Sequence, residues 1–164
     1  MTLFTAFEEL HARTPGRFHL LAVGDGTRRS ELEHARETTG AVSWMPYCGD
    51  AGELARIYRA ADIFVHPGIL ETFGLVTLEA QASGTPVVGI RGSYMDRIIF
   101  SNQTHWAREN TPAALADAIA AEAATDLSAA GAAAGLTVRE RYGWHTIFAR
   151  LFSIYRQVIA EYNP

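Results

Sequence analysis

Residues 66–89 have the sequence HPGILETFGLVTLEAQASGTPVVG, and this stretch carries the strongest fold signal in the chain. A proline ends the apolar run that leads into it, a glycine precedes the next apolar run, and Gly-x-Pro closes that run. This pattern predicts a loop over residues 68–74 and a helix over residues 75–82. Two glutamates eight residues apart, Glu71 and Glu79, then fall on the loop and about one turn inside the helix.

The start of the predicted helix has the properties of an anion site. Its first amides, near Gly74, Leu75 and Val76, have no intrahelical partner and carry the positive end of the helix dipole. Because Gly74 has no side chain, a diphosphate could approach the backbone closely. The Glu79 carboxylate can accept hydrogen bonds from two adjacent hydroxyls, such as the 2′ and 3′ hydroxyls of a ribose. Glu71 can reach a group on the other side of the phosphates, so the stretch predicts a receptor for a ribose, a diphosphate and a sugar.

Apolar periodicity places this stretch inside an alternation of strands and helices. Strands that are apolar throughout predict a parallel sheet covered on both faces, an α/β, Rossmann-like doubly wound fold in one domain over residues 1–164. Ligands of such sheets bind beyond the carboxyl ends of the strands, which here brings together the Gly24 turn, the loop after Met45 and the loop after His66. The predicted strands are residues 17–23, 41–45, 62–66 and 86–90, with a short edge strand at 104–109; the other predicted helices are residues 3–13, 28–37, 53–61, 112–124, 126–142 and 145–162, the last three being closing helices over about 112–162.

Composition excludes several classes of function. The 164 residues carry a formal net charge of -4, which leaves no basic face for nucleic acid. No segment approaches the roughly 20 consecutive apolar residues of a membrane span. The single cysteine, Cys48, excludes an internal disulfide and suits a reducing compartment. The first residues are acidic where a signal peptide is basic, so we expect a cytoplasmic protein.

The segment from Glu71 to Glu79 resembles the Glu-x7-Glu signature of the retaining glycosyltransferases of family four, in the C-terminal, nucleotide-sugar-binding domain of their GT-B fold. The resemblance extends over nearly the whole chain. LLAVGDGTRRSELE resembles the second strand and Gly-Asp-Gly turn of that domain, and VSWMPYCGDAGELARIYRAADIFVHP resembles its base-binding loop, helix and fourth strand. ALADAIAA and ERYGWHTIFARLFSIYRQVI resemble its closing helices.

This resemblance implies a hexosyltransferase and a role for each matching residue. Glu79 would hold the ribose hydroxyls, and Glu71, as the catalytic carboxylate, would contact the donor sugar or its phosphate. The backbone amides of Phe73, Gly74 and Leu75 would bind the diphosphate. The residues implied to face the base are Met45, Pro46 and Tyr47. The donor would be a nucleotide diphosphate sugar, with no metal and no further cofactor, since the helix terminus and basic side chains neutralise the phosphates in this family. The chain also has no Asp-x-Asp pair of the metal-dependent type.

Some features depart from the family pattern. Gly68 replaces a common serine, and Asp96 stands where a turn usually supplies a glutamate. The family's first strand, its two phosphate-binding cations and its N-terminal acceptor-binding domain would all precede residue 1. Without that central strand, the predicted strands 17–23 and 62–66 face each other across a gap one strand wide. We expect two unpaired apolar edges open to self-association, a rearranged sheet, or a piece of a longer parent chain, and we favour the piece, inactive or nearly so by itself.

Two other functions remain open at the level of sequence. The chain could be a non-catalytic module that keeps a nucleotide-sugar pocket, or a domain like that of a nucleotide-sugar epimerase, although the Glu-x7-Glu segment argues against the epimerase. Any two glutamates eight residues apart can also be solvated surface groups. For single residues, we expect His66 to be structural rather than a general base, and Tyr58 to belong to the core.

Overall fold

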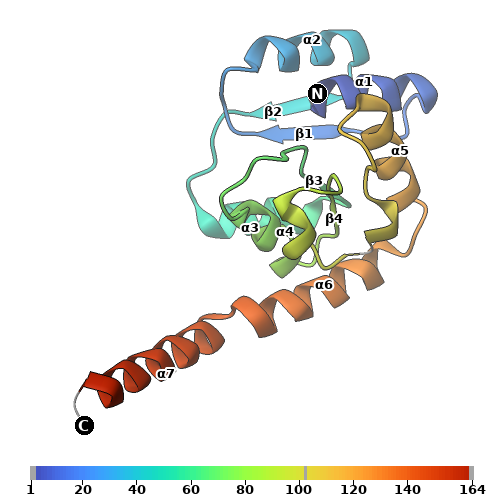
Figure 1. Ribbon diagram of the computed structural model, residues 1–164. Helices are drawn as coiled ribbons and strands as arrows, with labels where there is room; N and C mark the ends of the chain where they lie inside the picture. The colour runs from blue at the N-terminus through green and yellow to red at the C-terminus, as the bar shows by residue number, and fades with distance from the viewer. Residues whose placement is uncertain (1–2, 102, 163–164) are drawn as a thin grey trace.

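Strands and helices alternate along the first part of the chain and three helices close it, as the sequence predicts (Figure 1). The computed structural model describes residues 3–101 and 103–162. The strands are β1 (Leu20–Val23), β2 (Val42–Met45), β3 (Phe64–Val65) and β4 (Val87–Val88). The helices are α1 (Leu3–Arg13), α2 (Arg29–Thr39), α3 (Ala51–Ala60), α4 (Leu75–Ala82), α5 (Pro112–Glu122), α6 (Leu127–Tyr142) and α7 (Trp144–Tyr162), with two short 3₁₀ helices, η1 (Tyr94–Arg97) and η2 (Gln103–His105). The predicted α/β class with parallel strands is confirmed.

The four strands form two separate parallel pairs. β1 pairs with β2 along its whole length, from Leu20 opposite Val42 to Val23 opposite Met45. β3 pairs with β4, and Figure 1 shows this second pair below the first. Among residues 3–101 and 103–162, no strand pairing joins β1 to β3, so each of these strands has one edge without a ladder. This arrangement agrees with the first of the three expectations, two unpaired apolar edges.

The predicted strands were too long, and one of them was wrong. β1 begins at Leu20 rather than at residue 17, and β3 and β4 have two residues each. Residues 104–109 do not form an edge strand, since His105 ends a 3₁₀ helix and Ala107 makes a single parallel bridge to Ile90. A ladder continues only where a neighbouring strand supplies hydrogen bonds, and β1 and β3 each have one neighbour in place of two.

Helix α1 connects the two strand pairs through side-chain packing. Phe7 packs in one buried cluster with Val42 of β2. Ala6 and Leu10, from the same helix, pack in a second buried cluster with Val88 of β4. Burial of apolar surface, rather than a continuous ladder of backbone hydrogen bonds, therefore holds the two halves together.

A buried glutamine fixes helix α4. The Gln81 side chain donates from Nε2 to the carbonyl of Ile98 at 2.8 Å and to that of Thr77 at 3.1 Å. Its Oε1 accepts from the amide of Phe100 at 2.6 Å. We call these contacts the Gln81 network. Because they use both the donor and the acceptor of the side-chain amide, α4 is held against the segment that follows η1.

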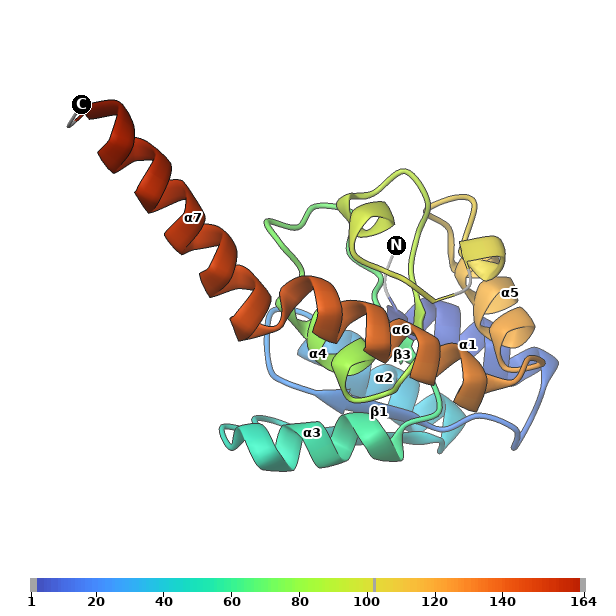
Figure 2. The ribbon, with the colours of Figure 1, turned by 90° about the horizontal axis from the view of Figure 1, so that it is seen from below.

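The closing helices complete the fold, and the last one leaves the body of the molecule (Figure 2). The Thr111 hydroxyl accepts from the amide of Ala114 and caps α5. Helix α6 packs on α4, whereas α7 buries none of its residues. Along α7 the rings of Trp144, Phe148 and Phe152 stack on one another at 5.4 and 6.2 Å between centroids. None of the described helices is both long enough and apolar enough to cross a membrane.

The contact between α6 and the turn after α4 gives a stability test. A Cβ at Gly131 would lie 1.9 Å from the carbonyl oxygen of Gly84. We expect Gly131→Ala to lower the free energy of unfolding by about 2 kcal/mol or more, because the packed backbone cannot yield, although alanine normally favours a helix by about 1 kcal/mol. Urea denaturation followed by circular dichroism measures this. The exposed Ala132→Gly in the same helix should cost only about 1 kcal/mol, and a stabilised Gly131→Ala would contradict the packing.

Candidate functional site

The N-terminus of α4 is built on a glycine. Gly74 is the N-cap, with a left-handed φ of 78°. The left-handed φ favours glycine, and a Cβ at this position would lie 2.7 Å from both Met95 Cε and Ile98 Cδ1, so the ends of these two side chains would have to move. The sequence suggested a ligand-based reason for this glycine, and the structure adds a steric one. Among the described residues, the amides of Gly74, Leu75 and Val76 have no hydrogen-bond acceptor, and the last two side chains are exposed. Gly74 itself is buried, whereas Leu75 and Val76 are exposed, so the free donors of these two residues begin the helix beside an exposed surface.

Phe73 connects the loop before α4 to the end of α6. Its ring is partly exposed and meets the ring of Tyr142 edge to face, with 6.1 Å between centroids. The contact holds the loop backbone beside the start of α4, where the Phe73 amide was predicted to bind a phosphate.

Glu79 lies on the exposed side of α4 and is held by a tyrosine from another helix. Its Oε2 accepts from the hydroxyl of Tyr58, on α3, at 3.3 Å. The pKa of Tyr58 is raised far above its ordinary value, first by burial and then by the charge and hydrogen bond of Glu79. The phenol therefore stays protonated and donates. In the part of the chain that the structure describes, the Oε1 atom of Glu79 has no hydrogen-bond donor. Tyr58 was expected in the core, where it is, but its contact with Glu79 was not predicted.

Glu71 lies against His66, the buried histidine that follows β3. Glu71 Oε1 is 3.4 Å from His66 Nε2, a close approach without hydrogen-bond geometry. Burial lowers the pKa of His66, and the nearby Glu71 partly opposes this shift. A Cβ at Gly68 would lie 3.0 Å from the same nitrogen, which gives a reason for glycine where the family commonly has serine. The expectation that His66 is structural agrees with its burial.

The segment predicted to face the base adjoins the Gly24 turn. The amide of Gly24 donates to the carbonyl of Met45 at 2.9 Å. In return, Trp44 Nε1 donates to the carbonyl of Gly24 at 2.8 Å. Of the three loops predicted to share one edge, the Gly24 turn and the loop after Met45 are therefore adjacent, whereas these hydrogen bonds do not reach the loop after His66. Pro46 and Tyr47, which follow, are exposed.

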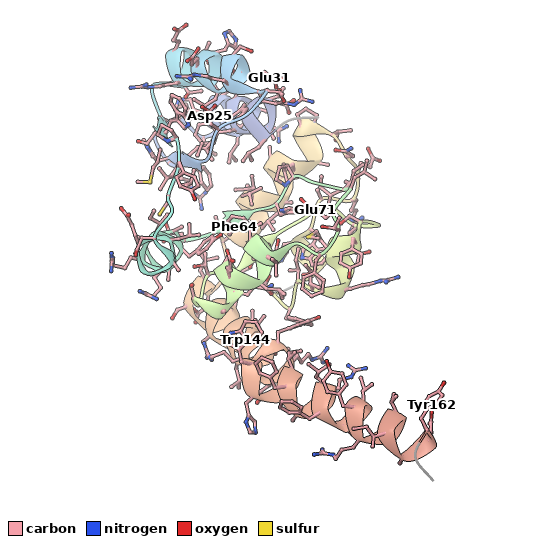
Figure 3. All side chains as sticks on the ribbon, turned by 90° about the vertical axis from the view of Figure 1, so that its left-hand side faces the viewer. Asp25, Glu31, Phe64, Glu71, Trp144 and Tyr162 are labelled. Carbon is pink, nitrogen blue, oxygen red and sulfur yellow. The ribbon has the colours of Figure 1, made fainter. Side chains whose placement is uncertain are left out.

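In the described part of the chain, no hydrogen bond or ion pair joins residues 45–47 to Glu71 or to α4. Figure 3 shows Asp25 on the half that carries α2 and Glu71 on the other half. Asp25 accepts from the amide of Gly26 at 2.8 Å and faces Arg29, so its carboxylate is used within its own turn. An open depression of about 350 Å³ adjoins this turn and is lined in part by Trp44. None of the residues predicted for the donor lines it.

Two further sequence features have local roles. Asp96, which stands where the family has a glutamate, accepts from the amide of Gly92 at 3.0 Å within its own loop. Among the residues that the structure describes, no group of three or more His, Cys, Asp or Glu side chains could hold a metal ion. Independence of metal stays a prediction.

The His66–Glu71 contact predicts how stability depends on pH. An unfolded histidine binds a proton below about pH 6.5, whereas the buried His66 resists it, so acid favours the unfolded state. The free energy of unfolding should fall from about pH 7 to about pH 5. Glu71→Gln should steepen this fall by removing the charge that opposes the shift, and His66→Asn should flatten it. Urea unfolding across this range measures the slopes. The exposed Glu37→Gln serves as control, and a flatter profile in Glu71→Gln would refute the contact.

Comparison with known proteins identifies the family. Residues 1–123 match the family described as Glycosyl transferases group 1. The chain is 37% identical over 169 aligned residues to a D-inositol 3-phosphate glycosyltransferase of Segniliparus rotundus, covering 96% of this chain and 36% of that protein. It is 32% identical over 142 residues to a phosphatidyl-myo-inositol mannosyltransferase of Mycobacterium leprae, covering 85% of this chain and 38% of that protein. The chain thus spans less than half the length of these relatives.

Solved structures agree with this result. Sucrose-phosphate synthase from Thermosynechococcus elongatus has 26% identity and a TM-score of 0.72, over 96% of this chain and 42% of that one. The Anabaena protein HepE, solved in complex with UDP and glucose, has a TM-score of 0.75 over 96% of this chain and 46% of that one, at 17% identity, which is a likeness of fold alone. The fold thus matches roughly two fifths of a GT-B glycosyltransferase chain. By its sequence and its fold, the chain belongs to the glycosyl transferases group 1 family.

Proposed function

We propose that this chain is the donor-binding part of a retaining hexosyltransferase. It holds a nucleotide diphosphate sugar while the hexose is transferred to an acceptor. The observation that carries the proposal is the combination of Glu79, exposed and held by Tyr58, with the free amides that begin the same helix. Family membership supports it, as do relatives whose names specify mannosyl transfer.

Different residues of α4 and of the loop before it would bind different parts of the donor. The amides of Gly74, Leu75 and Val76 bind the diphosphate, since a helix N-terminus is suited to anions. Glu79 accepts hydrogen bonds from the ribose hydroxyls, and Glu71 contacts the hexose side. The backbone from residue 45 to residue 47 receives the base.

The chemistry asked of these residues is mainly electrostatic. In a transfer from a nucleotide diphosphate sugar, the bond from the anomeric carbon to the diphosphate breaks, and negative charge grows on the departing phosphate oxygen. Donors that are already in position stabilise this charge without reorganising, so the amides at the start of α4 would lower the barrier without a metal.

The acceptor has to be supplied from elsewhere. The chain spans 36% of the Segniliparus relative, and we assign acceptor binding to a partner, an N-terminal domain of the family type.

A cytoplasmic location belongs to the same proposal and is supported by the free Cys48. The exposed Glu79 and the free amides at the start of α4 would equally serve a non-catalytic module that binds a nucleotide sugar, which is the second candidate. Restored transfer after adding an N-terminal half supports the enzyme, whereas an epimerised sugar as product would point to an epimerase.

Nucleotide titration tests the donor site. We expect uridine, guanosine or adenosine diphosphate to bind by isothermal titration calorimetry, and Glu79→Gln to weaken the best of them by about tenfold or more, because hydrogen bonds to a charged group are lost. Glu37→Gln, an exposed carboxylate on α2, should bind like the unchanged chain. The proposal would be refuted if no nucleotide bound at millimolar concentration, or if Glu79→Gln bound the nucleotide as tightly as the unchanged chain.

The open strand edges generate a second test, of self-association. Leu21 and Val23 of β1 are 44% and 39% exposed, beside an edge without a ladder. We expect concentration-dependent association, weakened by Leu21→Lys because a charge on an edge strand opposes pairing. Sedimentation equilibrium measures it, with the exposed Leu136→Lys on α6 as the control. Equal association of both variants would speak against pairing through β1.

A further inference from the structure

We infer that Tyr58 is a positioning residue for the donor site: its hydroxyl orients the carboxylate of Glu79 so that the free oxygen faces the ribose. This inference rests on the proposed function and adds to it a residue that contacts no ligand. Tyr58 lies on α3 and Glu79 on α4, and their side chains meet at 3.3 Å between the phenolic oxygen and Oε2.

Burial and two contacts fix Tyr58 itself. Its side chain is buried, with 7% exposed. Its ring meets that of Phe64, on β3, edge to face at 5.6 Å between centroids and 80° between planes. Its backbone carbonyl accepts from the hydroxyl of Thr85 at 2.5 Å, at the turn that follows α4. The phenol is therefore a rigid donor, and Glu79 meets it at a fixed point.

In the hydrogen bond between Tyr58 and Glu79, the tyrosine hydroxyl is the donor and the carboxylate is the acceptor. The pKa of Tyr58 is raised by burial and by Glu79, so the hydroxyl keeps its proton and donates a hydrogen bond to the carboxylate. An ionised carboxylate accepts only, so Oε1 and the remaining lone pairs of Glu79 are available to hydroxyl donors. A ribose diol is a pair of adjacent donors at the spacing of one carboxylate. Fixing the carboxylate beforehand also avoids the entropy cost of ordering a long, exposed side chain on binding.

The alternative is that Tyr58 serves only the core and meets Glu79 incidentally, and the two cases differ in a measurable way. Tyr58→Phe keeps the ring and its packing on Phe64 but removes the hydroxyl. A core role predicts lower stability and an equal change in affinity for every nucleotide. A positioning role predicts a loss of affinity only for nucleotides that carry the 2′ and 3′ hydroxyls of the ribose.

The experiment compares uridine and guanosine diphosphates with counterparts that lack both the 2′ and the 3′ hydroxyl, here called the deoxynucleotides, by calorimetry. In the unchanged chain, the ribonucleotide should bind more tightly than the deoxynucleotide. Tyr58→Phe should weaken the ribonucleotide about three- to tenfold and leave the deoxynucleotide nearly unchanged, so the preference for ribose shrinks. Tyr155→Phe, an exposed tyrosine on α7, should change neither affinity. Thermal unfolding of each variant reports its folded fraction.

Each outcome decides a separate point. If Glu79→Gln removes the preference for ribose and Tyr58→Phe keeps it, the positioning role is refuted and the donor site stands. If Tyr58→Phe weakens both nucleotides equally, Tyr58 acts through the core and the inference is again refuted. If no nucleotide binds, or if Glu79→Gln has no effect, the donor site itself fails and the inference fails with it.

Discussion

The proposed site depends on the Gln81 network more than on any other interaction. A helix of eight residues is not stable in water by itself, so α4 exists because tertiary contacts hold it. Gln81 and the close packing of Gly74 on Met95 and Ile98 fix the side of α4 that is buried. The opposite side of the helix, which carries Glu79, then faces the solvent. One set of buried contacts thus decides both which amides and which carboxylate a ligand can reach.

The division into two strand pairs has a consequence for the same site. The loop after Met45 belongs to the β1–β2 pair, whereas Glu71 and α4 belong to the β3–β4 part. A ladder fixes neighbouring strands about 4.8 Å apart, but among residues 3–101 and 103–162 no ladder joins β1 to β3, so no strand pairing sets the spacing of the two pairs. Here the spacing is set by α1, whose Phe7 and Leu10 pack in different clusters. Packing of side chains is a softer restraint than a ladder, so the subsites proposed for the base and the phosphates are less firmly coupled to each other than Glu79 is to Tyr58.

Helices were predicted more accurately from the sequence than strands, for a physical reason. The bounds of α4 follow from local signals, a glycine before and after it, and residues 75–82 agree with the prediction. A strand needs a partner that local sequence does not describe, which is why residues 104–109 failed and why β1 is shorter than predicted. The carboxylates of the proposed site were predicted because Glu71 and Glu79 have a recognisable spacing. Tyr58 carries no such signal, since its contact joins residues 21 positions apart and depends on how α3 packs against α4.

The groups behind the two carboxylates differ, and the difference bears on what each can bind. Glu79 is held by a neutral donor whose proton is fixed, which suits repeated hydrogen bonding to hydroxyls without any change of charge. Glu71 faces an imidazole whose burial lowers its pKa, so at neutral pH that imidazole does not offset the negative charge of Glu71. An uncompensated carboxylate repels a diphosphate but accepts well from sugar hydroxyls. The family resemblance left the sugar and its phosphate as alternatives for Glu71, and this electrostatic argument favours the sugar.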